Sequence, residues 1–332
     1  MAGSLTVVVS SADLDGLLAG AVAGRAAEGT AEAVVFDAQK LFEFFGPAVQ
    51  QRLPRGYNLV LCGLEVVHID WDGRLVRPRL MDALRNFLGP IRWFSAGPWD
   101  PDDRQAVGHI VGEGNVAISQ TGASVAGLVL DTYLRRSDGY EDSLVRLAEG
   151  RLTDEEEESW GRRARMVLTA LKADPHEMAA AVAMLMDQRL SELLGRYAEQ
   201  AVRTDETMRR FAGERAQEPR AMDDMRLVVL GLPPEWQPFH EEVSAYARQE
   251  KGAEFSLCHL EGRSVLLLEC SPSVRVDLRT WARYVTDLMP AAEAVGARPG
   301  VVPLVVRGLA QDVGLRDEVL GLLAEGAYLL KM

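Results

Sequence analysis

The sequence is poor in the residues that build metal clusters and disulfide frameworks. Its 332 residues include three cysteines and five histidines. Cys62, Cys258 and Cys270 form no CxxC pair, and only His259 lies next to a cysteine. This spacing gives no support to a structural zinc site, and we expect buried thiols without disulfides.

Long apolar runs and an excess of basic charge are also missing. No uninterrupted apolar stretch approaches the ~20 residues that a membrane helix needs. The N-terminus lacks the charged start and long apolar region of a secretory signal, so we expect a cytoplasmic protein with no membrane partner. The formal net charge of −13 argues against duplex nucleic acid as a partner, although a local basic groove stays compatible with it.

What the sequence does contain is an alternation of strand-like and helix-like segments. The length exceeds that of one compact core and predicts two domains. Apolar runs separated by helical stretches predict a mostly parallel sheet covered by helices. The predicted strands of this first domain, residues 1–150, are Leu5–Val9, Val34–Phe36, Tyr57–Leu61, Ile91–Phe94 and Val116–Ser119.

The chain then turns helical and ends in a smaller α/β domain. Thr153 followed by Glu156 is the signature of a capping box, so the acidic run Asp154–Glu158 is interpreted as a helix start rather than a metal cage. We expect a helical connector over 151–212, a polar linker over 213–225 and an α/β domain over 226–332. Its strand-like runs are MRLVVLGL, EFSLCHLEG, RSVLLLEC and VVPLVVRG.

Two carboxylates stand where the first predicted strand ends. In the stretch TVVVSSADLDG, Asp13 and Asp15 follow the apolar run and precede a helix rich in small residues. In parallel sheets, ligands bind at the carboxyl ends of the strands, beside helix N-termini. Asp13 and Asp15 are therefore candidate catalytic residues and metal ligands. The alternative is that Ser10, Ser11 and Asp13 only cap the helix.

The order of these segments resembles that of the DHH/DHHA1 phosphoesterases. The strand before DLDG, the small-residue helix, YNLVLCGLEV, GPIRWFSAGPW, the helical segment and the terminal α/β domain follow the family's order over nearly the whole chain. The resemblance implies an α/β fold with a parallel-sheet DHH-like domain and a DHHA1-like domain. It also implies manganese-dependent hydrolysis of phosphodiesters, short oligonucleotides, cyclic dinucleotides or pyrophosphate, with metal ligands at the strand ends.

Several ligand positions of the family carry other residues here. Asp13, Asp15 and Gly16 match the first motif, but Ser11 stands where the family commonly has histidine. In the second motif Gly63 replaces a bridging aspartate.

The nearest acid to that second position is Glu65. In the third motif, WFSAGPW, the aromatic flanks persist while Ser95, Ala96 and Gly97 replace the Asp-His-His core.

The resemblance also suggests where substrate would bind in the second domain. In SVRVDLRTWA, Arg275 and Arg279 correspond to the family's substrate-binding motif, and Arg298 in VGARPG takes the place of its histidine. Three arginines near one cleft can grip a phosphate bidentately. Surface arginines paired with the chain's many acids are the alternative interpretation.

A second acidic stretch, VVHIDWDG, imitates the first motif with His68, Asp70 and Asp72. Its place after the second motif corresponds to a variable loop of the family, and Asp-Gly is a turn signal. Asp70 is kept as a further candidate metal ligand together with Glu65.

Three functions follow as hypotheses, of which the third is a purely structural role as a subunit of a larger assembly, with no ligand at all. The first is a catalytically degenerate DHH/DHHA1-like protein, a pseudoenzyme that binds a phosphorylated small molecule, a nucleotide or a protein partner and needs no cofactor. The second is an active phosphoesterase with a reduced or rearranged site for manganese or magnesium, since these ions often bind through one or two carboxylates and the phosphates of a ligand. Asp13 and Asp15 alone do not supply the ligands of a two-metal centre.

Overall fold

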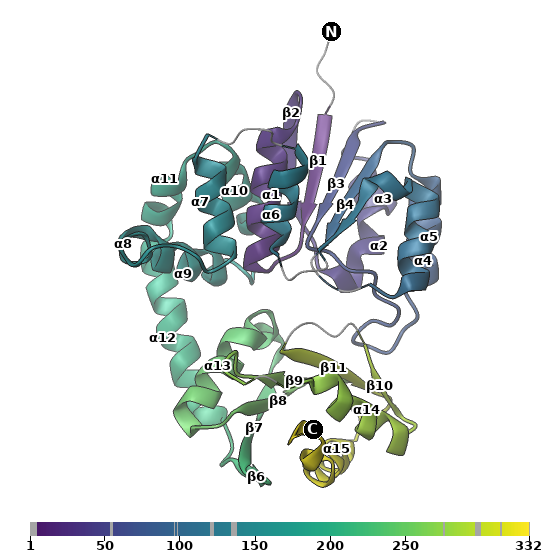
Figure 1. The fold of residues 1–332 in the computed structure, drawn as a ribbon, viewed down its shortest axis with the longest axis vertical. Coiled ribbons are helices and arrows are strands. Elements are labelled where there is room, and N and C mark those ends of the chain that lie inside the picture. The colour runs from purple at the N-terminus through teal and green to yellow at the C-terminus, as the bar shows by residue number, and fades with distance from the viewer. Residues whose placement is uncertain are drawn as a thin grey trace. The chain divides into compact units, whose positions relative to one another are not determined.

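The computed structural model describes residues 5–53, 56–95, 97, 99–119, 123–133, 138–274, 276–295, 300–312 and 314–331. By its contacts the chain divides into two compact units (Figure 1). The first unit comprises Met1–Val66 and Val76–Val202, and the second comprises Val67–Leu75 and Arg203–Met332. Within the described part of the chain, no helix is both long and apolar enough to cross a membrane.

The first unit is built on a five-stranded, wholly parallel sheet with the order β2-β1-β3-β4-β5. Its strands are β1 (Leu5–Ser10), β2 (Thr30–Val35), β3 (Asn58–Cys62), β4 (Ile91–Ser95) and β5 (Val116–Ile118). All five overlap the strands predicted from the sequence, because each contains a short apolar run. Ser10 pairs with Cys62, and Cys62 with Phe94, so the central strands end at the same level.

Helices cover both faces of this sheet (Figure 1). Along β1 the side chains alternate, so Val8 packs in one core and Val7 and Val9 pack in the other. The first face carries α1 (Leu14–Ala26), α6 (Val125–Tyr133), α7 (Tyr140–Ala148), α9 (Arg162–Ala170), α10 (Pro175–Met186) and α11 (Leu190–Arg196). The second face carries α2 (Leu41–Phe44), α3 (Pro47–Gln50), α4 (Arg77–Asn86) and α5 (Pro101–Val111).

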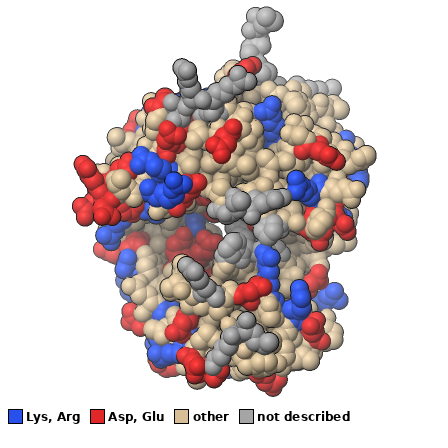
Figure 2. Space-filling model, viewed as in Figure 1, with Lys and Arg blue, Asp and Glu red and all other residues tan. Residues whose placement is uncertain are grey.

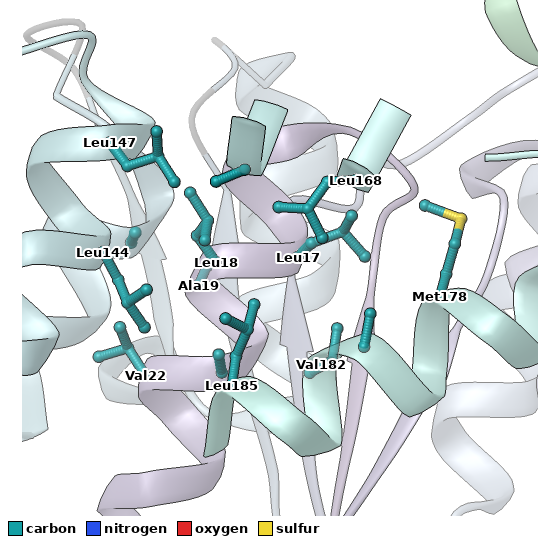
Figure 3. Packing of buried hydrophobic residues seen from close by; sticks show 14 of the residues in the cluster. Leu17, Leu18, Ala19, Val22, Leu144, Leu147, Leu168, Met178, Val182 and Leu185 are labelled. Atoms are coloured by element: carbon teal, nitrogen blue, oxygen red, sulfur yellow. The ribbon is translucent and has the colours of Figure 1, made fainter. Parts of the chain in front are cut away.

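Helix α1 lies at the centre of the first core. Its Leu17 and Leu18 are almost fully buried among leucines and valines of α7, α9 and α10 (Figure 3). The small residues of this helix allow it to approach β1 closely. A Cβ at Gly20 would overlap Ser10 Oγ and come within 3.3 Å of Ser10 Cβ, which explains the glycine at that position.

The acidic run after residue 150 is a helix start, as predicted. Thr153 caps α8 (Asp154–Glu156), and the reciprocal bonds between Thr153 and Glu156 complete a capping box. The chain continues through a π-helical turn (Glu157–Gly161) into α9 and later reaches α12 (Ala198–Arg215).

The second unit contains a mixed six-stranded sheet with the order β10-β11-β9-β8-β7-β6. Only β7 and β8 pair in parallel among its described strands. The strands are β6 (Arg220–Met222), β7 (Met225–Leu232), β8 (Phe255–Leu260), β9 (Val265–Cys270), β10 (Ala292–Ala294) and β11 (Val301–Val306). One face packs under α14 (Leu278–Leu288) and α15 (Gly314–Glu325), the other under α12 and α13 (His240–Lys251).

The fold is thus the α/β architecture expected from the sequence, with two further details. The short edge strands β6 and β10 were not predicted, and the expected linker 213–225 contains the end of α12 and all of β6. Residues 67–75, expected in the first domain, group with the second unit. The domain boundaries at 150, 212 and 225 stay predictions. Cys62 and Cys258 are buried free thiols, and Cys270 is half-buried.

Candidate functional site

The carboxyl edge of the first sheet brings together Ser11, Asp13 and Gly63, which follow β1 and β3. Hydrogen bonds of the ladder continue one residue past the strand ends. Ser11 N donates to Cys62 O at 2.9 Å, and Gly63 N donates to Phe94 O at 2.9 Å. These bonds bring the residues after β1 and β3 side by side at the edge where ligands bind in parallel sheets.

Asp13 is the N-cap of α1. Its Oδ1 accepts from Gly16 N at 2.8 Å, and its Oδ2 accepts from Ser11 Oγ at 2.7 Å. A carboxylate at this position satisfies a free helix N–H and is favoured by the helix dipole. Asp13 therefore caps α1, and its assignment as a metal ligand stays a prediction.

The Asp15 carboxylate accepts two hydrogen bonds from the first turn of a second helix, α6. Its Oδ2 accepts from Val125 N at 2.7 Å and its Oδ1 from Ala126 N at 3.0 Å, both at the start of α6. Burial raises the pKa of Asp15 to about 6; the two backbone donors lower it, and the charges of Asp13 and Glu149 raise it further. Asp15 therefore changes its charge near neutral pH.

The Ser11 side chain fills the space just beyond the carboxyl ends of β1 and β3. A Cβ added to Gly63 would overlap Ser11 Oγ and come within 2.9 Å of Gly16 Cα. Gly63 also has a φ of +74°, a conformation that residues with a Cβ rarely adopt. A Cβ at Gly16 would overlap the same hydroxyl. Ser11 and the two glycines thus form a closed contact at the position where the family's bridging aspartate is expected.

The tryptophans that flank the third motif, Trp93 and Trp99, donate hydrogen bonds to residues near the ends of β3 and β4. Trp93 is fully buried, and its Nε1 donates to Leu64 O at 2.8 Å. Trp99 Nε1 donates to Ser95 Oγ at 3.1 Å, and the two indole rings meet edge to face with their centroids 4.9 Å apart.

Glu65 lies against the same loop, because a Cβ at Gly97 would come within 2.8 Å of Glu65 Oε1. The persistence of the aromatic flanks has a structural explanation that does not require metal ligands. Ala96, between Ser95 and Gly97, lies outside the described residues.

Asp70 takes part in a turn and groups with the second unit. Its Oδ1 accepts from Asp72 N at 3.0 Å and from Arg74 N at 2.8 Å, and Gly73 adopts a φ of +79°. The Asp-Gly turn signal is confirmed by this geometry. Asp13, Asp15 and Glu65 belong to the first unit instead.

Of the three candidate substrate-binding arginines, one is described. Arg279 is exposed near the start of α14, where its backbone N donates to the N-cap residue Asp277. Arg275 and Arg298 lie outside the described residues.

Glu149 was not identified from the sequence, although it belongs to the same edge of the sheet. Its Oε1 accepts from Ser124 Oγ at 3.2 Å, while Ser124 Oγ accepts from Gly127 N at 2.9 Å in the first turn of α6. Serine three residues before a helix glycine is a weak capping signal, and nothing in the spacing links it to Glu149.

An open hollow of about 490 Å³ adjoins Glu149. Its other lining residues are Gly139, Asp142, Val145, Arg146 and Arg151. Both arginines are paired with acids, Arg146 with Glu156 at 2.6 Å and Arg151 with Glu149 at 2.8 Å. Figure 2 shows basic side chains over α7 beside acidic side chains over α8.

No group of three or more His, Cys, Asp or Glu side chains is arranged to hold a metal ion among the residues that the structure describes. The charges of Asp13 and Glu149 both act on the Asp15 carboxyl group and help to raise its pKa. However, each oxygen of Asp13 and Asp15 already accepts a hydrogen bond from the protein.

Comparison with solved structures identifies the fold. The chain is similar to RecJ from Thermus thermophilus in complex with Mn2+, with a TM-score of 0.62 and 11% identity over 98% of this chain and 52% of RecJ. It is also similar to a manganese-bound exonuclease RecJ, with a TM-score of 0.53 and 12% identity over 98% of this chain and 90% of that one.

A third similar structure is the DHH domain of a protein described as a member of a family of ribosomal proteins. Its TM-score is 0.55, with 13% identity over 99% of this chain and 87% of that chain.

The chain spans only about half the length of the Thermus RecJ. No protein-family model and no curated protein matches the sequence. The two-unit architecture and these similarities together show that the chain has a DHH/DHHA1 phosphoesterase-like fold.

Proposed function

We propose that this protein is a catalytically degenerate DHH/DHHA1-like module that binds a phosphorylated small molecule or a nucleotide. The observation that carries the proposal is the closed contact between Ser11, Gly16 and Gly63. A bridging carboxylate at residue 63 would need a Cβ where Ser11 Oγ and Gly16 Cα already lie.

The donor set of this edge does not fit a two-metal centre. Such a centre clamps the attacking and leaving oxygens, and several carboxylates and imidazoles must balance its charge. The histidine position of the first motif holds the buried hydroxyl of Ser11. Asp13 and Asp15 satisfy the first turns of α1 and α6. We therefore derive no hydrolytic step from these residues.

Binding without hydrolysis is supported by the hollow beside α7. Arg146 and Arg151 carry side chains that are 35% and 72% exposed, and each is held by one acidic partner. The Arg151 side chain is largely exposed, so its ion pair with Glu149 contributes little and a phosphate that offers bidentate hydrogen bonds can replace it. Arg275, Arg279 and Arg298 remain candidates for a second phosphate contact, and Arg279 is exposed.

The alternative is an active phosphoesterase with one weakly bound manganese or magnesium ion. Both similar RecJ structures contain manganese. Asp13 and Asp15 lie at the end of β1, where the resemblance implies metal ligands, with Glu65 on the same unit and Asp70 as the remaining candidate. Carboxylates that already accept one hydrogen bond can still bind an ion together with the phosphates of a ligand.

Calorimetry separates the two functions. Inorganic pyrophosphate is titrated into chelator-treated protein and into the Arg146→Gln, Arg151→Gln double variant. Arg85→Gln serves as control, since Arg85 is also exposed and paired with an acid but lies on α4. We expect metal-independent binding that weakens about tenfold or more in the double variant alone, the size of a lost charge-assisted bond.

The same protein is then titrated with manganese, alongside an Asp13→Asn, Asp15→Asn double variant. Tight manganese binding together with pyrophosphate or dinucleotide hydrolysis, both lost in the aspartate variant, would contradict the proposal and establish the alternative. Binding of a protein partner without any affinity for phosphate would contradict the ligand class only. A cytoplasmic location also stays a prediction, for which fractionation of cells is the direct measurement.

A further inference from the structure

A histidine of the second unit has a buried ring nitrogen without a hydrogen-bond partner. His259 lies on β8, and only 7% of the residue is exposed. Its Nε2 makes no hydrogen bond within the part of the chain that the structure describes. A buried polar atom without a partner costs free energy, and such atoms are uncommon in folded proteins. A ligand that reaches this nitrogen can supply the missing bond.

The face of the sheet that carries His259 is the one covered by α14 and α15. Side chains alternate along β8, and Leu257, two residues earlier, packs in the core beneath these helices. His259 pairs with Leu266 of β9, which belongs to the same core. Val319 of α15 is part of this core, and Leu315 packs against it. The imidazole therefore lies on the side of the sheet where α15 begins.

Arg316 follows Leu315 in the first turn of α15, and its charge acts on His259. Burial is the main cause that lowers the pKa of His259, and the charge of Arg316 lowers it further. The Arg316 side chain is only 19% exposed, and its one ion pair among the described residues is with its neighbour Asp317 at 3.3 Å. That bond uses Nε and Nη2, so Nη1 stays available for another partner.

Glu261 brings a carboxylate to the same place. The residue directly follows β8, and its backbone is held by a bond from its N to Leu232 O and a bond from Gln237 Nε2 to its O, each 2.9 Å long. Its Oε1 lies over Gly231, because a Cβ there would come within 2.8 Å of that oxygen. Gly231 pairs with His259. Glycine in this strand position therefore lets the carboxylate lie against the sheet beside the imidazole.

These three side chains gather at the carboxyl ends of β7 and β8, which run parallel. In open α/β sheets, ligands bind beyond the carboxyl ends of parallel strands. All three residues belong to the second unit, so the arrangement is complete within it. It shares no residue with the hollow beside α7, which belongs to the first unit.

The charges around His259 favour a ligand that carries both signs. A guanidinium binds a carboxylate through two hydrogen bonds, and a neutral imidazole can donate a third from Nε2. The Glu261 carboxylate repels an anion but accepts hydrogen bonds from an ammonium group. A doubly charged phosphate fits this set less well, because Glu261 opposes it. Arg316 opposes a simple cation in the same way.

We propose that His259, Arg316 and Glu261 form a binding site for a small free α-amino acid. Arg316 and His259 Nε2 hold its carboxylate, and Glu261 holds its ammonium group. Nε2 is buried while both charged side chains are partly exposed, so the ligand enters when Arg316 or Glu261 moves aside. The proposal is independent of phosphate binding at the hollow and of any hydrolysis.

Glycine is the probe, because it carries both charged groups and no side chain. It is titrated into the full chain while the imidazole nitrogens are followed by NMR, and calorimetry measures the dissociation constant. We expect the Nε2 signal of His259, assigned with the His259→Gln variant, to shift on binding. The signal of His109 is the control and should not respond, since His109 is exposed on α5 of the first unit.

Variants of the two charged residues test how the ligand is held. Arg316→Gln and Glu261→Gln should each weaken glycine binding about tenfold or more, the size of a lost charge-assisted bond. Arg283→Gln is the matched control and should bind glycine normally, since Arg283 is exposed on α14. Acetate and methylamine each carry one of the two groups, so both should bind about tenfold or more weakly than glycine.

Three results would overturn the proposal. The first is the absence of both heat and an Nε2 shift with glycine, alanine and serine at millimolar concentrations. The second is glycine binding that is unchanged in Arg316→Gln and in Glu261→Gln. The third is acetate that binds as tightly as glycine, which would indicate an oxyanion site instead. If His259→Gln does not fold, the other two variants carry the test, because they change partly exposed side chains.

Discussion

Ser11 and Gly63 pack so closely that a methyl group on residue 63 would overlap the Ser11 hydroxyl. The two residues follow neighbouring strands, β1 and β3, and Ser11 N is bonded to the carbonyl of Cys62. This contact lies where the resemblance to the DHH/DHHA1 family implies metal ligands. Our proposal that the protein is catalytically degenerate rests on the close packing at this edge of the sheet.

The contact predicts the cost of adding a side chain at residue 63. Gly63→Ala should destabilise the protein by about 2–4 kcal/mol, from backbone strain at positive φ together with the overlap. Gly56→Ala is the matched control, since Gly56 has a φ of +76° but no atom of the described residues within 4 Å of the added Cβ. Urea unfolding of both variants measures the difference. If both variants lose the same free energy of unfolding, backbone strain alone explains the cost of Gly63→Ala, and the space beside Ser11 can hold a methyl group.

Asp15 predicts a distinct pH dependence of stability. Its pKa of about 6 in the folded protein lies above the ordinary 3.8. The folded state therefore binds the proton more tightly than the unfolded state. The contribution of Asp15 is fully favourable below pH ~3.8, falls as pH rises to ~6, and then stays lower by about 3 kcal/mol.

Replacing Asp15 by asparagine should remove this fall. Free energies of unfolding measured between pH 4 and 7 should decline less, or rise more, with pH in Asp15→Asn than in the unchanged protein. Asp131→Asn, an exposed change in the same helix α6, should keep the original profile. Parallel profiles for Asp15→Asn and the unchanged protein would show that the Asp15 carboxyl titrates normally.

Trp93 should stabilise the segment that follows β3, in addition to its contribution to the hydrophobic core. Trp93→Phe leaves the buried Leu64 carbonyl without its indole donor, which we expect to cost about 2–4 kcal/mol including lost packing. Trp281→Phe is a matched control in the second unit, because the fully buried Trp281 donates to Leu323 O at 2.7 Å.

Both tryptophan variants should lose stability in urea unfolding. Only Trp93→Phe should also accelerate hydrogen exchange at residues 63–66. Equal acceleration in the two variants would indicate a global effect rather than a local one.

The capping box of α8 predicts a modest, local effect. Thr153→Ala should destabilise the protein by about 1 kcal/mol, since the backbone N of Glu156 loses its acceptor. Thr153→Ser keeps the hydroxyl and should be close to neutral.

Hydrogen bonds from Arg146, with the capping bonds from Thr153, lower the pKa of Glu156 to about 2. The stabilisation from Glu156 is therefore present above pH ~4.5 and lost as pH falls toward 2.

Thermal unfolding between pH 2 and 6 checks this prediction. A Glu156→Gln variant should show a smaller loss of stability on acidification than the unchanged protein. An identical acid response in both would exclude Glu156 as a contributor.

Local patterns in the sequence were sufficient to predict most of the elements. The five strands of the first sheet are short apolar runs bounded by polar or turn residues, and α8 carries its own capping signal at Thr153. The Asp-Gly turn at residues 72 and 73 also depends on neighbouring residues alone. Such features are decided by interactions over a few positions, and a single sequence contains them.

Residue patterns along the chain were enough to predict the α/β architecture, the parallel first sheet and the place of Asp13 and Asp15 at the end of β1. The hydrogen-bond partners of Asp15 and the position of Glu149 could not be predicted in this way. The partners of Asp15 are the amides of α6, more than a hundred positions away, and Glu149 reaches the same edge from beyond α7. The docking of residues 67–75 on the second unit likewise depends on His240, Arg263 and Ser264. Contacts between such distant segments arise from packing and hydrogen bonding in three dimensions, which residue spacing along one chain does not encode.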